Sequence, residues 1–231
     1  MSFSTLKAVV CDADGTLFQL KDPLATTYSE ILGEYGYRLD KESFNTNIKR
    51  VWQDFEPEYL NEREHHKTSP ERERAVWYIF IDTICKACGI SEVTFDAKDA
   101  LYSYYASGES RSVCQELQEL LVEATDNGLA IYLASNNDMR VHSLVQALFP
   151  PDFFSGVFTA GELGWKKPSP KFFKTIEDRI HLTPHEILHM GNDKKLDIQA
   201  AENAGWRALH FSPSDLTEIK KIVRVLSEDK S

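Results

Sequence analysis

Two carboxylates stand one residue apart, directly after a short apolar run near the start of the chain. The run Ala8–Cys11 has the length and composition of a buried strand, and Asp12 and Asp14 follow it. Gly15 allows the backbone to turn sharply after them. At the carboxyl end of a strand in an open α/β sheet, one carboxylate can act as nucleophile or metal ligand, and the next can exchange protons with a leaving group. An ordinary aspartate-rich turn is the structural alternative.

Two further segments carry groups that suit a phosphate. A second apolar run ends in Ser135 and Asn136, where a hydroxyl and the following backbone amides could bind phosphate oxygens or, alternatively, cap a helix. Lys167 precedes Pro168, which favours an extended backbone at the lysine. A fixed ammonium at that point would hold a phosphoryl group beside the nucleophile. The neighbouring Lys166 is expected to be a solvated surface charge.

Four segments of the chain resemble the four motifs of the haloacid dehalogenase (HAD) superfamily and follow one another in the same order. The members of this superfamily are mostly Mg²⁺-dependent phosphohydrolases. The segments are Asp12–Leu17, Ser135–Asn137, Gly164–Phe172 and Gly191–Asp197. The resemblance implies that Asp12 is the nucleophile and Asp14 the general acid and base. It implies that phosphate is bound by Ser135, Asn136 and Lys167. It implies that Mg²⁺ is bound by Asp12, Asp14, Asp193 and Asp197.

The fourth segment departs from the family pattern. Many relatives have an aspartate directly after the glycine, where this chain has Asn192. The metal-binding pair is therefore either Asp193 with Asp197, or Asn192 with Asp197. A carboxylate binds Mg²⁺ better than an amide, which favours Asp193.

The order of the expected elements predicts an α/β fold. From residue 110 onward, apolar strands alternate with helices, which is typical of a doubly wound parallel sheet. Residues 20–106 show only helical patterns, and the best marked begins with Ser69 as N-cap and Pro70 at the first helical position. The resemblance implies a Rossmann-like core at 1–17 and 108–231 with a helical cap domain at 18–107. Other helices are expected over 23–35, 41–55, 96–106, 113–124 and from Asp193 to Gly205.

Composition restricts the partners. The net charge of −10 argues against nucleic acid and anionic membranes, because both need a basic surface. No signal peptide is evident and no apolar run approaches the roughly 18 residues of a membrane span, so a cytoplasmic location is expected. Cys85 and Cys88 lack a second ligand pair, which favours reduced thiols over a zinc site. The expected partner is a small phosphorylated substrate, and the oligomeric state stays open.

The resulting hypothesis is a Mg²⁺-dependent phosphatase that acts on a small phosphorylated metabolite through an aspartyl-phosphate. The dehalogenases of the superfamily lack an acid at the position of Asp14, which weighs against that chemistry. A phosphomutase and a non-catalytic module that binds phosphometabolites or signals are the alternatives, and Asn192 favours the latter. The charged cluster Arg63–Lys67 is expected to face water. The aromatic set Tyr102, Tyr104 and Tyr105 is expected to serve packing rather than recognition.

Overall fold

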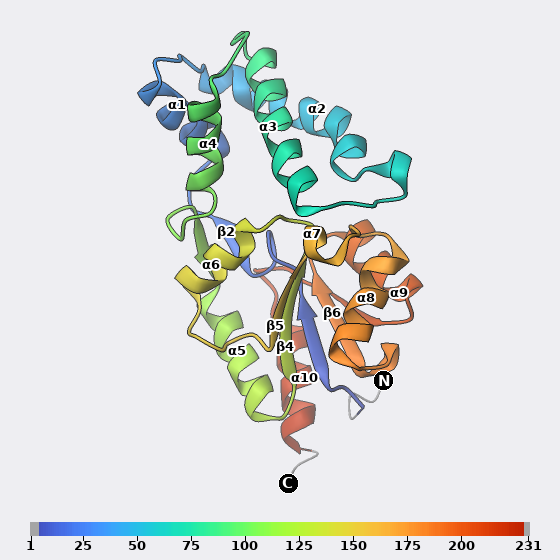
Figure 1. Cartoon of the computed structure of the whole chain (residues 1–231). Coiled ribbons are helices and arrows are strands. Elements are labelled where there is room, and N and C mark those ends of the chain that lie inside the picture. Colours follow the sequence, from blue (N-terminus) through green and yellow to red (C-terminus); the bar gives the residue numbers. More distant parts are fainter. Residues whose placement is uncertain (1–4, 229–231) are drawn as a thin grey trace.

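The computed structural model describes residues 5–228, and a five-stranded parallel sheet lies at the centre of its core (Figure 1). The strand order is β5-β4-β1-β6-β7, so the first strand lies in the middle. The order reverses at β1, and the carboxyl end of such a strand is where open α/β sheets bind ligands. The predicted doubly wound α/β fold is therefore confirmed. The strands are β1 (Ala8–Cys11), β4 (Ala130–Ser135), β5 (Gly156–Thr159), β6 (Ile187–Gly191) and β7 (Arg207–His210).

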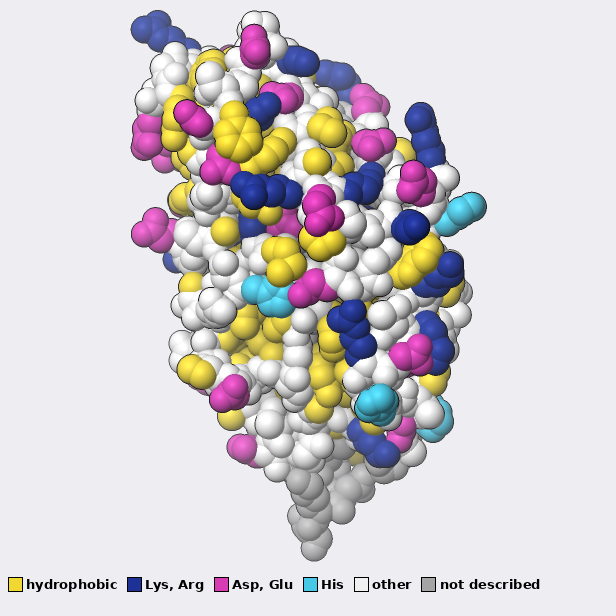
Figure 2. All heavy atoms as spheres, in the orientation of Figure 1, with side chains coloured by type: hydrophobic (Ala, Val, Ile, Leu, Met, Phe, Trp, Pro, Cys, Tyr) yellow, Lys and Arg dark blue, Asp and Glu magenta, His cyan; other side chains and the backbone are white. Residues whose placement is uncertain are grey.

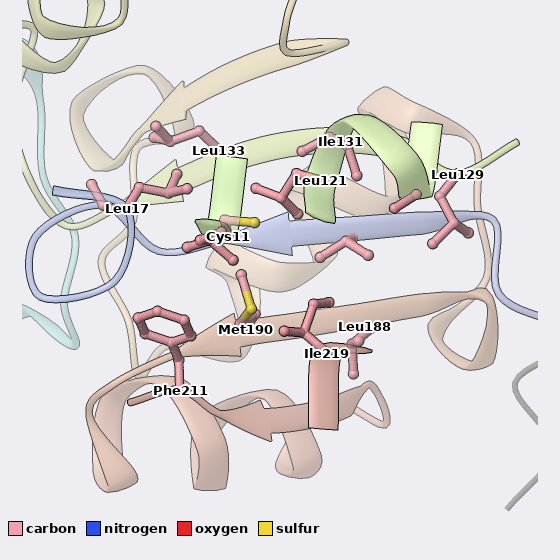
Figure 3. Packing of buried hydrophobic residues seen from close by; sticks show 14 of the residues in the cluster. Cys11, Leu17, Leu121, Leu129, Ile131, Leu133, Leu188, Met190, Phe211 and Ile219 are labelled. Carbon is pink, nitrogen blue, oxygen red and sulfur yellow. The ribbon is translucent and has the colours of Figure 1, made fainter. Parts of the chain in front are cut away.

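Helices bury both faces of this sheet. Cys11, Leu133 and Met190 come from three adjacent strands and pack with Leu121 and Ile219 of two covering helices (Figure 3). A second apolar cluster covers the other face, because alternate residues of each strand point in opposite directions. The helices of the core are α5 (Gln115–Asp126), α6 (Arg140–Leu148), α7 (Ala160–Leu163), α8 (Pro170–Ile180), η2 (Pro184–Glu186), α9 (Ala200–Asn203) and α10 (Thr217–Glu228).

Four helices form a separate cap with its own apolar cluster, and Figure 1 shows them stacked above the sheet. Ser69 accepts a hydrogen bond from the Arg72 amide and Pro70 opens the third cap helix, as predicted. The second helix extends beyond the expected end near Phe55 and brings Tyr59 to the core, where its hydroxyl donates to the Asn136 carbonyl. The cap elements are α1 (Leu24–Glu34), α2 (Lys41–Tyr59), η1 (Glu62–Glu64), α3 (Pro70–Ala87) and α4 (Phe95–Tyr104).

Two local predictions were wrong. Val113 was expected to begin a helix, but β3 (Arg111–Val113) pairs with β2 (Phe18–Leu20) in a two-stranded antiparallel ribbon between cap and core. The ribbon forms because the two chain segments that enter and leave the cap run side by side. The single helix expected up to Gly205 is replaced by a π-helical turn, η3 (Lys194–Gln199), followed by the short α9.

The surface of the protein carries charged side chains of both signs. On the face shown in Figure 2, acidic and basic side chains lie interspersed over cap and core. None of the helices within residues 5–228 combines the length and apolar composition that crossing a membrane requires. Cys85 and Cys88 are free thiols. In the cluster Arg63–Lys67 every residue is exposed as expected except His66, which is half-buried with its Nδ1 2.9 Å from the Leu60 carbonyl oxygen. The exclusion of nucleic acid stays a prediction.

Candidate active site

Lys167 lies between two carboxylates at the carboxyl end of β1. Its Nζ is 2.5 Å from Asp12 Oδ1 and 2.6 Å from Asp197 Oδ1. His189 of β6 lies 3.2 Å from the same Asp197 oxygen through Nε2. All four side chains are buried. The structure thus brings together three residues that were predicted from separate motifs and adds His189, which the sequence did not single out.

Burial and charge act against each other in this cluster. Burial raises the pKa of Asp12 to about 7, Lys167 opposes that rise, and Asp197 adds to it. Burial alone would lower the pKa of Lys167, yet the two carboxylates raise it above its usual value. Burial likewise works against ionisation of Asp197, but Lys167 and His189 hold the pKa of that carboxyl well below its usual range. The Lys167 ammonium is therefore the counter-ion of two carboxyl groups, and the cluster carries surplus negative charge once Asp12 ionises.

Asp14 is held by two residues that the sequence did not single out. Its Oδ1 accepts from Arg111 Nε and its Oδ2 from Asn137 Nδ2, both at 2.8 Å. Arg111 comes from β3, and its guanidinium carbon lies 5.3 Å from the centre of the Tyr105 ring. Asp14 thus has a fixed orientation, although 43 % of its side chain remains exposed. A fixed but accessible carboxyl group suits proton exchange with a substrate.

The second motif positions Lys167 through the side chain of Asn136. Asn136 donates through Nδ2 to the Lys167 carbonyl and accepts from the Lys167 amide through Oδ1. Its side chain is therefore occupied in positioning Lys167, which leaves a phosphate-binding role to its main chain. Ser135 is buried at the end of β4, and its hydroxyl accepts from the Asn137 amide at 3.1 Å. Phosphate binding by both residues stays a prediction.

In the fourth motif, two glycines permit close approaches. A Cβ on Gly191 would stand 2.3 Å from the Asp197 carboxyl carbon, so glycine lets Asp197 reach Lys167. A Cβ on Gly15, whose φ is +83°, would lie 2.5 Å from the Asn192 amide nitrogen. Asn192 therefore packs against the turn that holds Asp14, and its Oδ1 accepts from the Thr16 hydroxyl at 3.2 Å.

Asp193 has a capping role in the structure, and its binding of Mg²⁺ stays a prediction. Its Oδ1 accepts from the amides of Lys195 and Leu196, so the exposed carboxylate caps the π-helical turn η3. Of the two registers that the sequence left open, the structure places Asn192 rather than Asp193 against the first motif. The preference for Asp193 rested on ligand chemistry alone, because the sequence does not show which side chain must cap the helix.

Lys166 is not a solvated surface charge. It is fully buried, its ammonium pairs with Glu73 of α3, and it lies 3.7 Å from the centre of the Tyr59 ring. Glu73 also accepts from the Thr68 hydroxyl. Burial lowers the pKa of Lys166 to about 8, even though Glu73 opposes that shift. This pair joins the third-motif loop of the core to the cap.

A cavity of about 590 Å³ lies between cap and core, with Asp14 and Asn137 among its lining residues. Tyr102 and Tyr105 also line it, and both pack against other aromatic rings of the cap, as expected. Tyr104 is not part of the lining. The carboxylate predicted to protonate a leaving group is therefore part of the cavity wall.

A sequence model of the haloacid dehalogenase-like hydrolases matches residues 6–205. The chain belongs to this family. Among curated proteins it is similar to human haloacid dehalogenase-like hydrolase domain-containing protein 3, with 21 % identity over 202 residues that cover 87 % of this chain and 79 % of the relative.

Two solved structures show the same fold as this HAD-like hydrolase. The Bacillus subtilis HAD-hydrolase YfnB, solved with bound magnesium, superposes with a TM-score of 0.72 at 16 % identity, covering 89 % of this chain and 88 % of that one. The L-2-haloacid dehalogenase of Xanthobacter autotrophicus superposes with a TM-score of 0.67 at 20 % identity, covering 96 % and 88 %. The predicted superfamily is confirmed.

Mg²⁺ binding by the four predicted carboxylates of this HAD-like hydrolase stays a prediction. Asp12 and Asp197 contact the same Lys167 ammonium, whereas Asp14 is held by Arg111 and Asn137, and Asp193 caps η3. Within residues 5–228, no group of three or more acidic, histidine or cysteine side chains could hold a metal ion. The candidate nucleophile Asp12 carries one carboxylate, and Asn192 presents its amide oxygen to Thr16 in the turn that follows Asp12. One carboxylate, one amide and a negatively charged cluster fit an ion such as Mg²⁺, which takes its other ligands from water and a substrate phosphate.

Proposed function

We propose that this HAD-like hydrolase is a phosphatase that cleaves the monoester of a small phosphorylated metabolite in the cytoplasm. The observation that supports this most strongly is the position of Asp14. It follows the candidate nucleophile by two residues, is fixed by Arg111 and Asn137, and lines the cavity that would receive the leaving group.

In the first half-reaction, one carboxylate oxygen of Asp12 attacks phosphorus and the bond from phosphorus to the ester oxygen breaks. Asp14 donates its proton to that oxygen, and the alcohol departs into the cavity. In the second, Asp14 takes a proton from water, whose oxygen attacks phosphorus and releases phosphate and the Asp12 carboxylate. Lys167 stabilises the charge on the transferred group, and Ser135 orients it.

Magnesium fits this proposal as a further source of positive charge. Asp12 and Asn192 would hold it, and it would offset the negative charge of the phosphoryl oxygens. Asn192→Ala is then expected to raise the Mg²⁺ concentration needed for a shift in melting temperature, since an ion bound only to the folded state stabilises it. Asp193→Ala is the matched control. It should lower the melting temperature without Mg²⁺, because a helix cap is lost, but it should leave the Mg²⁺ concentration needed for the shift unchanged. The reverse ranking would support the Asp193 register.

Phosphate release from p-nitrophenyl phosphate, with Mg²⁺ and with a chelator, tests the proposed activity. The wild-type protein should release phosphate, and Asp12→Asn should not. Chloride release from 2-chloropropionate is measured in parallel, because the fold is shared with dehalogenases. Chloride release without phosphate release would overturn the phosphatase proposal. Binding of phosphate esters without either product would indicate a non-catalytic module.

A further inference from the structure

The cavity between cap and core changes character along its depth. At the core end its lining is polar, with Asp14, Asn137 and Arg111. The cap end is lined by apolar side chains of α2 and α3, among them Phe44, Trp52 and Phe80. Trp52 stacks on a second tryptophan at a centroid distance of 6.3 Å and an interplanar angle of 20°. The wall that would surround the leaving group is therefore largely aromatic.

The two cations of this lining are already neutralised. Arg111 pairs with Asp14, and Arg140 Nε lies 2.8 Å from Asp138 Oδ1. The Arg140 guanidinium also lies 4.3 Å from the centre of the Tyr102 ring and 4.9 Å from that of Trp77. Arg111 regains the Asp14 carboxylate as its partner once Asp14 has given its proton to the leaving oxygen, and Arg140 keeps Asp138. Among the described lining residues, no cation is then left to receive an anionic leaving group. A charged group placed here would lose hydration without gaining a counter-ion.

A sugar or other polyol would meet mainly apolar side chains at the cap end, because the unpartnered polar atoms of the lining, Trp77 Nε1 and Gln19 Nε2, are themselves buried in the wall. Each hydroxyl that leaves water without a new hydrogen bond costs free energy, whereas an apolar ring gains from the same burial. Aromatic rings additionally prefer edge-to-face and offset-stacked contacts of the kind that the aromatic walls offer. The volume of about 590 Å³ lies within the range of pockets that hold ligands of two or three fused rings.

We propose that the alcohol of the substrate carries a bulky, uncharged, ring-bearing apolar group, and that this group fills the aromatic end of the cavity while its phosphate lies at Asp12 and Lys167. This inference rests on the proposed phosphatase function and specifies its substrate class. Trp52 is then a specificity-determining residue. It forms part of the wall that would contact the ring, and it belongs to the cap helix α2 rather than to the segments that carry Asp12 and Asp14.

The test compares four monophosphates of primary alcohols, whose scissile bonds have similar reactivity. They are ethyl phosphate, 2-naphthylethyl phosphate, glucose 6-phosphate and the anionic 2-phosphoglycolate. We expect kcat/KM for the naphthyl ester to exceed that for ethyl phosphate by on the order of 10²-fold, because the buried ring contributes binding energy in the transition state. Neither of the other two esters should exceed ethyl phosphate. A naphthyl advantage below about threefold, or a higher kcat/KM for the sugar or the anionic ester, would overturn the inference.

Variants locate the preference in the cavity. Trp52→Ala should reduce the naphthyl-to-ethyl ratio of kcat/KM at least about tenfold, whereas Trp52→Phe, which keeps an aromatic wall, should retain most of it. Phe95→Ala is the matched control, because Phe95 is an exposed cap aromatic outside the cavity lining, and it should leave the ratio unchanged. Should Trp52→Ala fail to fold, Trp52→Gln replaces it. An unchanged ratio in the folded Trp52 variant would contradict the assignment.

A binding measurement separates this inference from the proposed function. If none of the esters releases phosphate, the phosphatase proposal fails, and calorimetric titration with 2-naphthylethanol then tests the cavity alone. Binding to the wild-type protein that weakens at least about tenfold in the Trp52 variant would support the cavity assignment. Absence of binding, or equal binding by both proteins, would overturn it.

Discussion

Lys166 and Lys167 are neighbours in the sequence but belong to two different buried charge clusters. Lys167 contacts Asp12 and Asp197, both at the strand ends of the core. Lys166 contacts Glu73, which lies in a cap helix. One peptide bond therefore separates the group that would hold a phosphoryl anion from the group that attaches the cap to the core.

The charge balance of the two clusters explains their opposite pKa directions. Two carboxylates share Lys167 and raise its pKa in spite of burial, whereas one carboxylate does not offset the burial of Lys166, whose pKa falls to about 8. A balanced pair such as Lys166 with Glu73 is suited to holding two parts of a fold in register. The cluster around Lys167 has surplus negative charge and is suited to binding a cation or a proton during chemistry.

Substitution of the nucleophile should affect only the first cluster and should have the largest effect. Asp12→Asn is nearly isosteric, but its amide is neither a nucleophile nor an anion, so the rate of phosphate release should fall on the order of 10⁴-fold or more. The circular dichroism spectrum should match that of the wild type. Retained Mg²⁺-dependent turnover in the purified variant would show that Asp12 is not the nucleophile.

Removal of Lys166 should affect the second cluster through stability. Lys166→Met leaves Glu73 buried without its partner, which should lower the free energy of unfolding by about 3–5 kcal/mol in urea titrations. The double variant with Glu73→Leu should recover most of that loss, because it removes the unpaired charge. Wild-type stability in the single variant would contradict the structural role of this pair.

The two lysines should differ most clearly in catalysis. Lys167→Met should reduce kcat/KM on the order of 10²-fold or more, because a fixed charge at the transferred group is lost. Lys166→Met, assayed where it is fully folded, should lose much less, since its ammonium points into the cap interface. Equal losses in the two variants would mean that the third motif has been assigned to the wrong lysine.

The smallest expected effect is a pH dependence of stability. The folded pKa of Lys166 is about 8 and its usual value is 10.5, so between these values the unfolded chain binds a proton that the folded chain has released. The contribution of Lys166 to stability should therefore be complete above about pH 10.5 and be lost as the pH falls towards 8, by at most about 1.4 kcal/mol per pH unit. Urea titrations of the wild type and Lys166→Met across this range measure the difference. A difference that stays constant with pH would show that the pKa of Lys166 is not lowered by burial.

The sequence by itself predicted most of the core. Apolar runs that end in Asp12, Ser135 and Gly191 indicated strands, and the carboxyl ends of parallel strands meet at one edge of a sheet. For that reason, the sequence alone predicts that residues of separate motifs, such as Asp12, Lys167 and Asp197, lie close together. The helical character of the cap also followed from local patterns, as the N-cap at Ser69 shows.

Only the tertiary structure determined which of several similar side chains faces the site and which has a structural role. Lys166 meets a glutamate 93 residues away in the cap, and Arg111 meets Asp14 at a distance of 97 residues, so no local pattern could reveal either pairing. Asn192 and Asp193 are adjacent, and only the direction of the backbone after β6 turns the first towards Gly15 and the second to the helix cap. Spacing in the sequence determined where functional groups arise along the chain, whereas packing between distant segments determined which of them face the site.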